Sequence, residues 1–313
     1  MGRYIGKRIV QMFLLLVALT FIVFASLYLA PGDPAQMVAG PSATEEDIAH
    51  VRTALGLDQP FIVQYAIYLK NLLTFNLGTS YSTHQPIATE IAIRLPNTLN
   101  LALASMILSI LVGVPAGIIA ALRKDKLIDN VLTTTSLAGI SIPNFWLGTM
   151  LIYLFSVKLR WFPSGGMNAP FWTAQGFKQI VLPAIALSTA TIASFTRIGR
   201  SSMLEVMQSD YIRTAKSKGL SSWLIVVVHA LRNALIPLVT QFGTSFGGLL
   251  GGAIITEQVF VVNGIGTYLI NAINTRNYPV VQSTVLIIAA MFILINLGVD
   301  IMYSFIDPRI RYD

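Results

Sequence analysis

Few side chains in this 313-residue sequence have the types and spacing that covalent or metal chemistry requires. The sequence has no cysteine, which excludes thiolate nucleophiles, disulfides and cysteine metal sites. Its three histidines, His50, His84 and His229, belong to no HExxH pair or carboxylate cluster, so we expect packed or solvated imidazoles and no metal site. It also has no GxxxxGK[ST] phosphate loop. We therefore predict a chain that is not an enzyme and binds no cofactor of its own.

The one acidic cluster, Glu45, Glu46 and Asp47, is better explained by helix formation than by catalysis. Ser42 stands three residues before Glu45, which is a capping-box spacing, and acidic residues in a first turn are stabilised by the helix dipole. The helix is predicted to end near Gly56. A second helix should follow along the outer membrane interface, because these residues recur at helical spacing: Phe61, Tyr65, Tyr68 and Leu72.

The composition indicates a membrane protein. Hydrophobic residues make up 54% of the chain and charged residues 11%, whereas a soluble domain carries about 25% charged residues. The formal net charge of +7 is also found in nucleic-acid-binding proteins, but the basic residues lie between apolar runs and not on one soluble surface. We therefore expect membrane lipid, and no nucleic acid, as the surroundings of this chain.

Six apolar stretches without ionisable side chains are long enough to cross a bilayer, which takes about 20 residues. They run from Ile9 to Pro31, Leu95 to Leu122, Val131 to Val157, Ile180 to Thr196, Asn233 to Thr256 and Tyr278 to Val299. Since lipid offers no partner for a free backbone group, each stretch is predicted to be a helix. The first is too long for a signal-peptide core and is interpreted as a retained anchor.

The distribution of basic residues predicts both termini in the cytoplasm. With this orientation, 14 of the 21 lysines and arginines lie on the cytoplasmic side. The resulting organisation is a first span (residues 1–31), an extracytoplasmic helical loop (32–94), a five-helix core (95–306) and a cytoplasmic tail (307–313).

The largest cytoplasmic loop in this topology, residues 197–232, is predicted to be structured. It contains "DYIRTAKSKGLSSW" and carries six basic and two acidic residues. Met203, Met207, Tyr211 and Ala215 recur every fourth residue, which predicts one face of a helix. Gly219 suits a helix C-terminus, after which the chain should restart a helix that leads into the fifth span. An interfacial helix on anionic lipid is the alternative that composition alone leaves open.

Ten segments spread over the whole chain resemble, in order, those of one family: the B-type inner-membrane permease subunits of binding-protein-dependent ABC importers for dipeptides, oligopeptides, glutathione or nickel. The segments are "YLAPGDPAQ", "LGLDQPFIVQY", "NLGTSY", "RLPNTLNLAL", "SIPNFWLG", "HALRNALIPLVT", "GGAIITEQVF", "GIGTYLI", "NYPVVQ" and "DPRIR". "DYIRTAKSKG" resembles the family's cytoplasmic signature loop. Arg213 stands where the wider permease family has an acidic residue, a departure that the peptide subgroup shares. Three further departures bear on the substrate: Asn76, Asn263 and Asn277.

The resemblance implies an all-α, six-span permease with the fold of type I ABC importers, in a bacterial cytoplasmic membrane. Its expected partners are a second homologous permease, two ATP-binding subunits that use ATP and magnesium, and an extracytoplasmic solute-binding protein. It also implies that the loop forms a coupling helix that docks on an ATPase. The residues assigned to that coupling loop are Asp210, Tyr211, Arg213, Thr214, Ala215, Lys216, Gly219 and Leu220.

Two further sets of residues are candidates for helix packing and for the transport path. The glycines of "GTSFGGLLGG" repeat at i+4 and would let another helix approach closely, either in this chain or in a second permease: Gly243, Gly247, Gly248, Gly251 and Gly252. Uncharged polar residues of the spans could line a path or simply pack: Ser141, Asn144, Gln241, Thr244 and Ser245.

Small peptides are the first expectation for the substrate, with nickel, a nickel chelate or glutathione as alternatives. A stand-alone, proton-coupled transporter is the alternative from another class. Such a transporter needs acidic groups or histidine within its spans, whereas here the six runs are neutral, with Glu257 and Asp300 at their edges. The sequence thus favours energy supplied by a partner.

The charge asymmetry can be tested by labelling, because the chain has no native cysteine. A single cysteine replacing Glu46 should react with an impermeant thiol reagent added outside intact cells, and one replacing Lys216 should not. The reverse pattern would exclude the predicted orientation.

Overall fold

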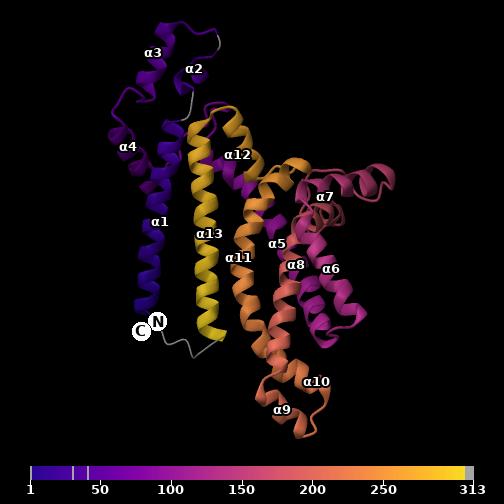
Figure 1. Cartoon of the computed structure of the whole chain (residues 1–313). Helices are drawn as coiled ribbons and strands as arrows, with labels where there is room; N and C mark the ends of the chain where they lie inside the picture. Colours follow the sequence, from indigo (N-terminus) through magenta and orange to yellow (C-terminus); the bar gives the residue numbers. More distant parts are fainter. Residues whose placement is uncertain (1, 30–31, 41, 307–313) are drawn as a thin grey trace. The chain divides into compact units, whose positions relative to one another are not determined.

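The computed structural model describes residues 2–29, 32–40 and 42–306, and within these ranges the regular structure is helical apart from one isolated antiparallel bridge between Thr79 and Pro86. The predicted tail, residues 307–313, lies outside the described residues. In chain order the helices (Figure 1) are α1 (Gly2–Tyr28), α2 (Pro34–Ala39), α3 (Glu45–Ala54), α4 (Phe61–Leu73), α5 (Ile87–Leu122), α6 (Leu127–Ser141), α7 (Asn144–Leu151), η1 (Ile152–Lys158), α8 (Ala174–Met207), α9 (Asp210–Ser217), α10 (Ser222–Leu224), η2 (Ile225–Ala230), α11 (Leu231–Val259), α12 (Ile265–Asn274) and α13 (Tyr278–Ile306). The segments η1 and η2 are π-helical.

Five helices of the described chain are long and apolar enough to cross a membrane, and a bent pair provides a sixth if it is counted as one span. The prediction of six spans is confirmed on that count. The helices are longer than the apolar runs: α8 begins at Ala174 and ends at Met207, and an unbroken helical segment runs from Ser222 to Val259. These helices include polar residues on both sides of the predicted apolar runs, because helical hydrogen bonding does not require an apolar side chain.

The third predicted span, Val131 to Val157, is not one continuous helix. It consists of α6 and of α7 with η1, which meet at an angle of 101°. Ile142 has an extended backbone (φ −85°, ψ 122°), as expected for a residue before proline, and Pro143 begins the new direction. Figure 1 shows α7 turning away from α6. The hydropathy of the sequence did not reveal this break, because Ile142 and Pro143 are themselves uncharged and leave the apolar run long enough for one span.

The acidic cluster does begin a helix, but the predicted capping pair is wrong. Thr44 caps α3 by accepting a hydrogen bond from the Asp47 backbone, while the Asp47 side chain accepts one from the Thr44 backbone. The Thr44 hydroxyl also lies 2.7 Å from the same carboxylate, and these hydrogen bonds lower the pKa of Asp47. The helix ends before Gly56, which has a φ of +66°, so its predicted end is confirmed.

One of two compact units comprises the described chain up to Pro96 together with Asn263–Ile293. Its aromatic cluster joins α1 to α4, with rings of Phe24 and Tyr68 stacked at 5.6 Å and the Tyr65 hydroxyl 3.0 Å from that of Thr20. The Asn277 amide donates to the hydroxyls of Ser80 and Ser82 and accepts from the Tyr81 backbone. These bonds fix the loop before α5 to the start of α13.

The second unit comprises Asn97–Val262 with a portion that starts at Leu294, and it is organised around α8. Helices α6, α7 and α11 pack against α8, and half-way along its length most of its residues are buried. On α5, Gly113 and Gly117 allow backbone contact: a Cβ on Gly117 would lie 2.5 Å from the Thr196 carbonyl oxygen and 2.9 Å from the Arg200 nitrogen. Helices pack this closely only where a side chain is missing.

The contact of α5 with α8 predicts a large difference between two glycine substitutions. In Gly117→Ala the new methyl group meets backbone atoms that cannot rotate away, and overpacking of this kind costs about 1–3 kcal/mol. Gly298→Ala in α13 is the matched control, because a Cβ there has no neighbour within 4 Å in the described chain. We expect the thermal unfolding midpoint of the purified protein to fall for Gly117→Ala only. Equal midpoints would show that α5 and α8 do not touch here.

Candidate functional site

The predicted coupling loop is a compact helical turn that joins α8 to α11 (Figure 1). Helix α8 continues to Met207, and a helix restarts at Ser222, so the turn itself is shorter than the predicted residues 197–232. The prediction that Met203, Met207, Tyr211 and Ala215 form one face of a single helix is wrong, because the first two lie in α8 and the last two in α9. The chain breaks at Gln208 and Ser209, where Ser209 has an extended backbone (φ −69°, ψ 151°).

The inner face of α9 is held by the chain's own core. Ile212 and Ala215 are buried there, and Leu220 packs against the same cluster, which comprises Ala121, Met203, Ile212, Ala215, Ile225, Ala230 and Ala234. Ala215 is only 8% exposed. In this structure it supports the loop from its inner face, and its contact with an ATPase remains a prediction.

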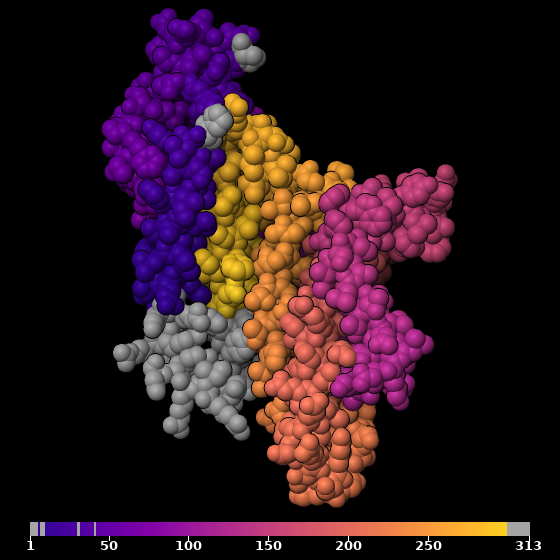
Figure 2. All heavy atoms as spheres, viewed as in Figure 1, coloured from indigo at the N-terminus to yellow at the C-terminus, as the bar shows by residue number. Residues whose placement is uncertain are grey.

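The outer face of α9 is polar and exposed. Asp210, Tyr211, Arg213, Thr214 and Lys216 all lie at the surface. The Arg213 and Asp210 side chains are 3.7 Å apart and almost fully solvated, so their ion pair contributes little stability and leaves both available to a partner. Figure 2 shows this part at one end of the second unit, directly against the ends of α8 and α11. The loop therefore presents a charged helix surface on an apolar support.

The turn after α9 requires glycine, as predicted. Gly219 has a φ of +74°, and this turn lets the Leu220 backbone donate to the Ala215 carbonyl at 3.3 Å. No atom of the described chain lies within 4 Å of a Cβ built on Gly219. The requirement is therefore conformational and not steric.

The base of the loop is tied to two other helices. Arg200, near the end of α8, makes a bidentate contact with Asp129 of α6, at 2.6 and 2.7 Å. Asp129 is 2% exposed and also accepts from the Asp125 backbone, so the carboxylate is fully hydrogen-bonded. The Ser202 hydroxyl donates to the Ala234 carbonyl of α11. These bonds tie the end of α8, from which the loop continues, to both α6 and α11.

Sequence reasoning missed two features of this site. It did not pair Asp129 with Arg200, which are 71 residues apart. It also gave no role to Trp223, whose side chain follows the glycine turn and is 74% exposed. The available signal was its position: a tryptophan in a basic loop outside every apolar run has no bilayer core to enter, and exposed aromatic residues are enriched at interfaces.

The five glycines of α11 do not share one environment. Gly252 packs inside the unit, where a Cβ would lie 3.0 Å from Leu187 of α8. Gly248 and Gly251 are exposed, with no described atom within 4 Å of a built Cβ, whereas Gly243 is buried and Gly247 is partly buried. Close packing inside the chain is thus seen at Gly252, and an external partner remains a prediction for Gly248 and Gly251.

The five candidate path residues are only partly brought together. Within α11, Gln241 donates to Ser245 at 2.7 Å. The side-chain amide of Asn144, which belongs to α7, lies near Gly252 of α11. Ser141 and Thr244 are exposed, and each bonds to a carbonyl of its own helix. A role in lining a path remains a prediction.

Two family models together match nearly the whole chain. The model described as "Binding-protein-dependent transport system inner membrane component" matches residues 113–312, and its N-terminal companion matches residues 1–102. Among similar proteins, the dipeptide transport system permease protein DppB of Alkalihalophilus pseudofirmus is 42% identical and covers 99% of both chains. The probable peptide ABC transporter permease protein of Sinorhizobium fredii and the glutathione transport system permease protein GsiC of Salmonella typhi are each 42% identical over 100% of both chains.

Solved structures show a similar fold. Two inward-facing crystal forms of the MetNI methionine ABC transporter match with TM-scores of 0.60 and 0.58, at 16% and 18% identity. Each covers 71% of this chain and 99% of the matched chain. This likeness confirms the predicted fold class of importer permeases.

The geometry of the loop predicts that of two valine substitutions, one at Gly219 and one at Lys216, only the first loosens the loop. Gly219→Val forces a β-branched residue into a left-handed conformation, at a cost of about 1–2 kcal/mol. Amide hydrogen exchange over residues 210–220 should therefore accelerate by about tenfold. Lys216→Val introduces the same side chain at an exposed helical position and should leave exchange nearly unchanged. Similar exchange in both variants would contradict a glycine-dependent turn.

Proposed function

Because this chain belongs to the family of inner membrane components of binding-protein-dependent transport systems, we propose that it is the permease subunit of an ATP-driven importer of short peptides. The observation that supports this most directly is the exposed charged face of α9 on a buried support, tied by Arg200 and Asp129 to the helices beside it. Such a surface suits docking of an energy-supplying partner.

In this proposal the chain makes and breaks no bond in its substrate. It works in a bacterial cytoplasmic membrane with both termini in the cytoplasm, beside a second homologous permease and two ATPase subunits that bind ATP and magnesium. An extracytoplasmic solute-binding protein delivers the substrate. The exposed Gly248 and Gly251 are candidates for contact with the second permease, and Gln241, Ser245 and Asn144 for the path.

Short peptides are the substrate class that the relatives favour. Two of the relatives above carry peptide or dipeptide in their names, and the third carries glutathione, which is itself a tripeptide. A permease for glutathione is thus a variant of the same proposal and not a different chemistry.

The mechanism is a population shift between two states of the assembled transporter. Closure of the ATPases would displace α9, whose buried inner face prevents it from moving independently of α8 and η2. Because Arg200 and Ser202 bond α8 to α6 and α11, the displacement would pass to the spans as a rigid-body motion. Alternating access follows if each state opens the path to one side.

We expect the exposed face, and not the buried one, to control ATPase docking. In the double variant Arg213→Glu with Trp223→Ala, a charge reverses and an exposed aromatic ring is lost, so ATPase affinity should fall at least tenfold. Peptide-stimulated ATP hydrolysis by the reconstituted complex should fall with it.

Lys70→Glu on the exposed side of α4 is the control for charge reversal, and it should leave ATPase affinity unchanged. Peptide uptake by vesicles that contain this chain alone and a proton gradient would instead show a stand-alone transporter. That result would reject the proposed function.

A further inference from the structure

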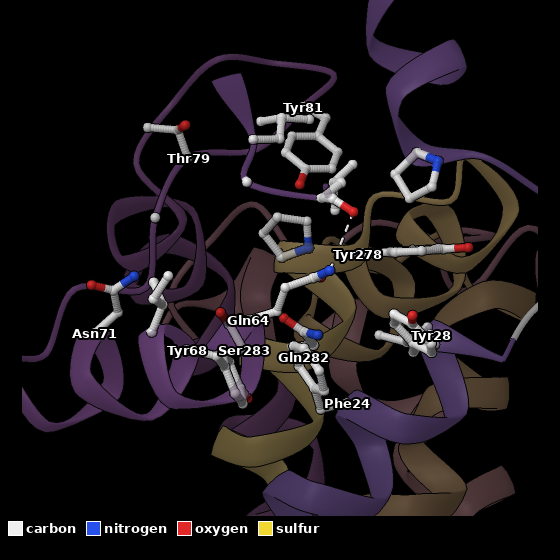
Figure 3. A pocket seen from close by; sticks show the side chains of 18 of the residues that line it. Phe24, Tyr28, Gln64, Tyr68, Asn71, Thr79, Tyr81, Tyr278, Gln282 and Ser283 are labelled. Carbon is white, nitrogen blue, oxygen red and sulfur yellow. Dashed lines mark hydrogen bonds between the residues drawn. The ribbon is translucent and has the colours of Figure 1, made fainter. Parts of the chain in front are cut away.

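The first unit contains a pocket of about 730 Å³ that plays no part in the coupling loop or the glycine face (Figure 3). It lies among the end of α1, the end of α3, helix α4, residues 76–81 and the start of α13. Pockets of this volume are in the range of small-ligand sites. Figure 3 shows Tyr81 and Tyr278 on one side, Phe24 and Tyr68 on another, and Gln282 between them.

The pocket wall contains hydrogen-bonding groups that this chain does not satisfy. The hydroxyls of Tyr68 and Tyr278 are buried, and neither has a hydrogen-bond partner among the described residues. Burial raises the pKa of Tyr68 and, with Tyr278 nearby, raises the pKa of Tyr81 to about 12. The hydroxyls of Tyr68 and Tyr81 thus remain protonated donors at physiological pH. Buried polar groups without partners are rare in native proteins, and two in one pocket indicate a missing partner.

The other groups of the wall define the chemistry of that partner. Asn71 and Gln282 contribute side-chain amides, which both donate and accept hydrogen bonds, and Phe24 and Tyr28 contribute aromatic surface. Among the described lining residues the charged groups are Arg52 and Asp33, which lie 2.5 Å apart and are partly exposed. The pocket therefore offers one cation, one anion, amides, hydroxyls and an apolar surface, with no net charge.

We propose that this pocket binds a short zwitterionic peptide, as a site additional to any path between the two permeases. Peptide carbonyls would accept hydrogen bonds from the tyrosines, an apolar side chain would contact Phe24, and the terminal charges would meet Asp33 and Arg52. An anionic phospholipid fits less well, because the pair of Arg52 and Asp33 offers one charge of each sign and such a lipid supplies a partner only for Arg52. The inference rests on the proposed function and assigns the peptide a place in the outer subdomain before it enters the spans.

The unsatisfied hydroxyls allow a test that separates ligand binding from stability. The double variant Tyr68→Phe with Tyr278→Phe keeps both rings and removes two groups that bond to nothing in the chain, so its thermal stability should be equal or higher. If a peptide is their partner, affinity should fall by about tenfold, since each bond contributes roughly a factor of two to ten. The measurement is equilibrium binding of radiolabelled alanyl-phenylalanine to the full transporter complex in nanodiscs, without ATP or solute-binding protein.

Tyr65→Phe is the matched control on the same helix. Its hydroxyl bonds to Thr20 and not to the pocket, so this variant should lose some thermal stability and bind peptide as the unmodified complex does. Asn71→Leu, at an exposed position of the pocket wall, gives a second, independent variant that should also weaken binding.

The outcomes separate the pocket from the proposed function. Weaker peptide binding by the double variant and by Asn71→Leu, with Tyr65→Phe unaffected, supports the site. Equal binding by all complexes, or no binding by the unmodified one, overturns it even when that complex imports peptide with ATP. Native mass spectrometry that finds a phospholipid retained by the unmodified complex and lost from the double variant, with peptide affinity unchanged, overturns it in favour of lipid. An unmodified complex that fails to import any peptide with ATP would contradict the proposed function itself.

Discussion

Helices in lipid gain little from burying apolar side chains against one another, because the surrounding lipid is equally apolar, so close approach of backbones has to hold them together. In the second unit this approach occurs along α8. Gly113 and Gly117 bring α5 to within backbone contact of α8, Gly252 of α11 leaves room for the Leu187 side chain of α8, and the Arg200–Asp129 pair adds α6. The remaining features of that unit, including the orientation of the loop, depend on this packing.

The loop is a consequence of where α8 and α11 end. Met203 and Ala234 belong to those helices, and together they form the apolar surface on which Ile212 and Ala215 pack. Small residues at the contact let α9 lie close to its support, and its polar side chains therefore face outward. The residues of this signature thus divide into two sets: Ile212, Ala215 and Leu220 pack in the core of the loop, and the charged residues of α9 remain exposed.

The two units differ in how they treat buried polar groups. In the second unit, Asp129 accepts hydrogen bonds from Arg200 and from backbone, and Ser202 donates to a carbonyl, so those groups are satisfied internally. In the first unit, Asn277 is equally well bonded, but the hydroxyls of Tyr68 and Tyr278 are not. Satisfied groups stabilise a scaffold, whereas the two hydroxyls are the observation on which the proposed peptide site rests.

The sequence by itself determined the number of apolar runs, the end of α3 before Gly56 and the glycine turn at Gly219, because length, hydropathy and backbone conformational freedom are local properties. It also supported the family, through short segments in a fixed order. Only the tertiary structure decided that α6 and α7 meet at 101°, that Thr44 and not Ser42 caps α3, and that Ala215 faces inward. The pairing of Asp129 with Arg200 and the pocket around Tyr278 were likewise invisible, since each joins residues far apart in the chain. Such contacts depend on how helices pack, and no local pattern encodes that arrangement.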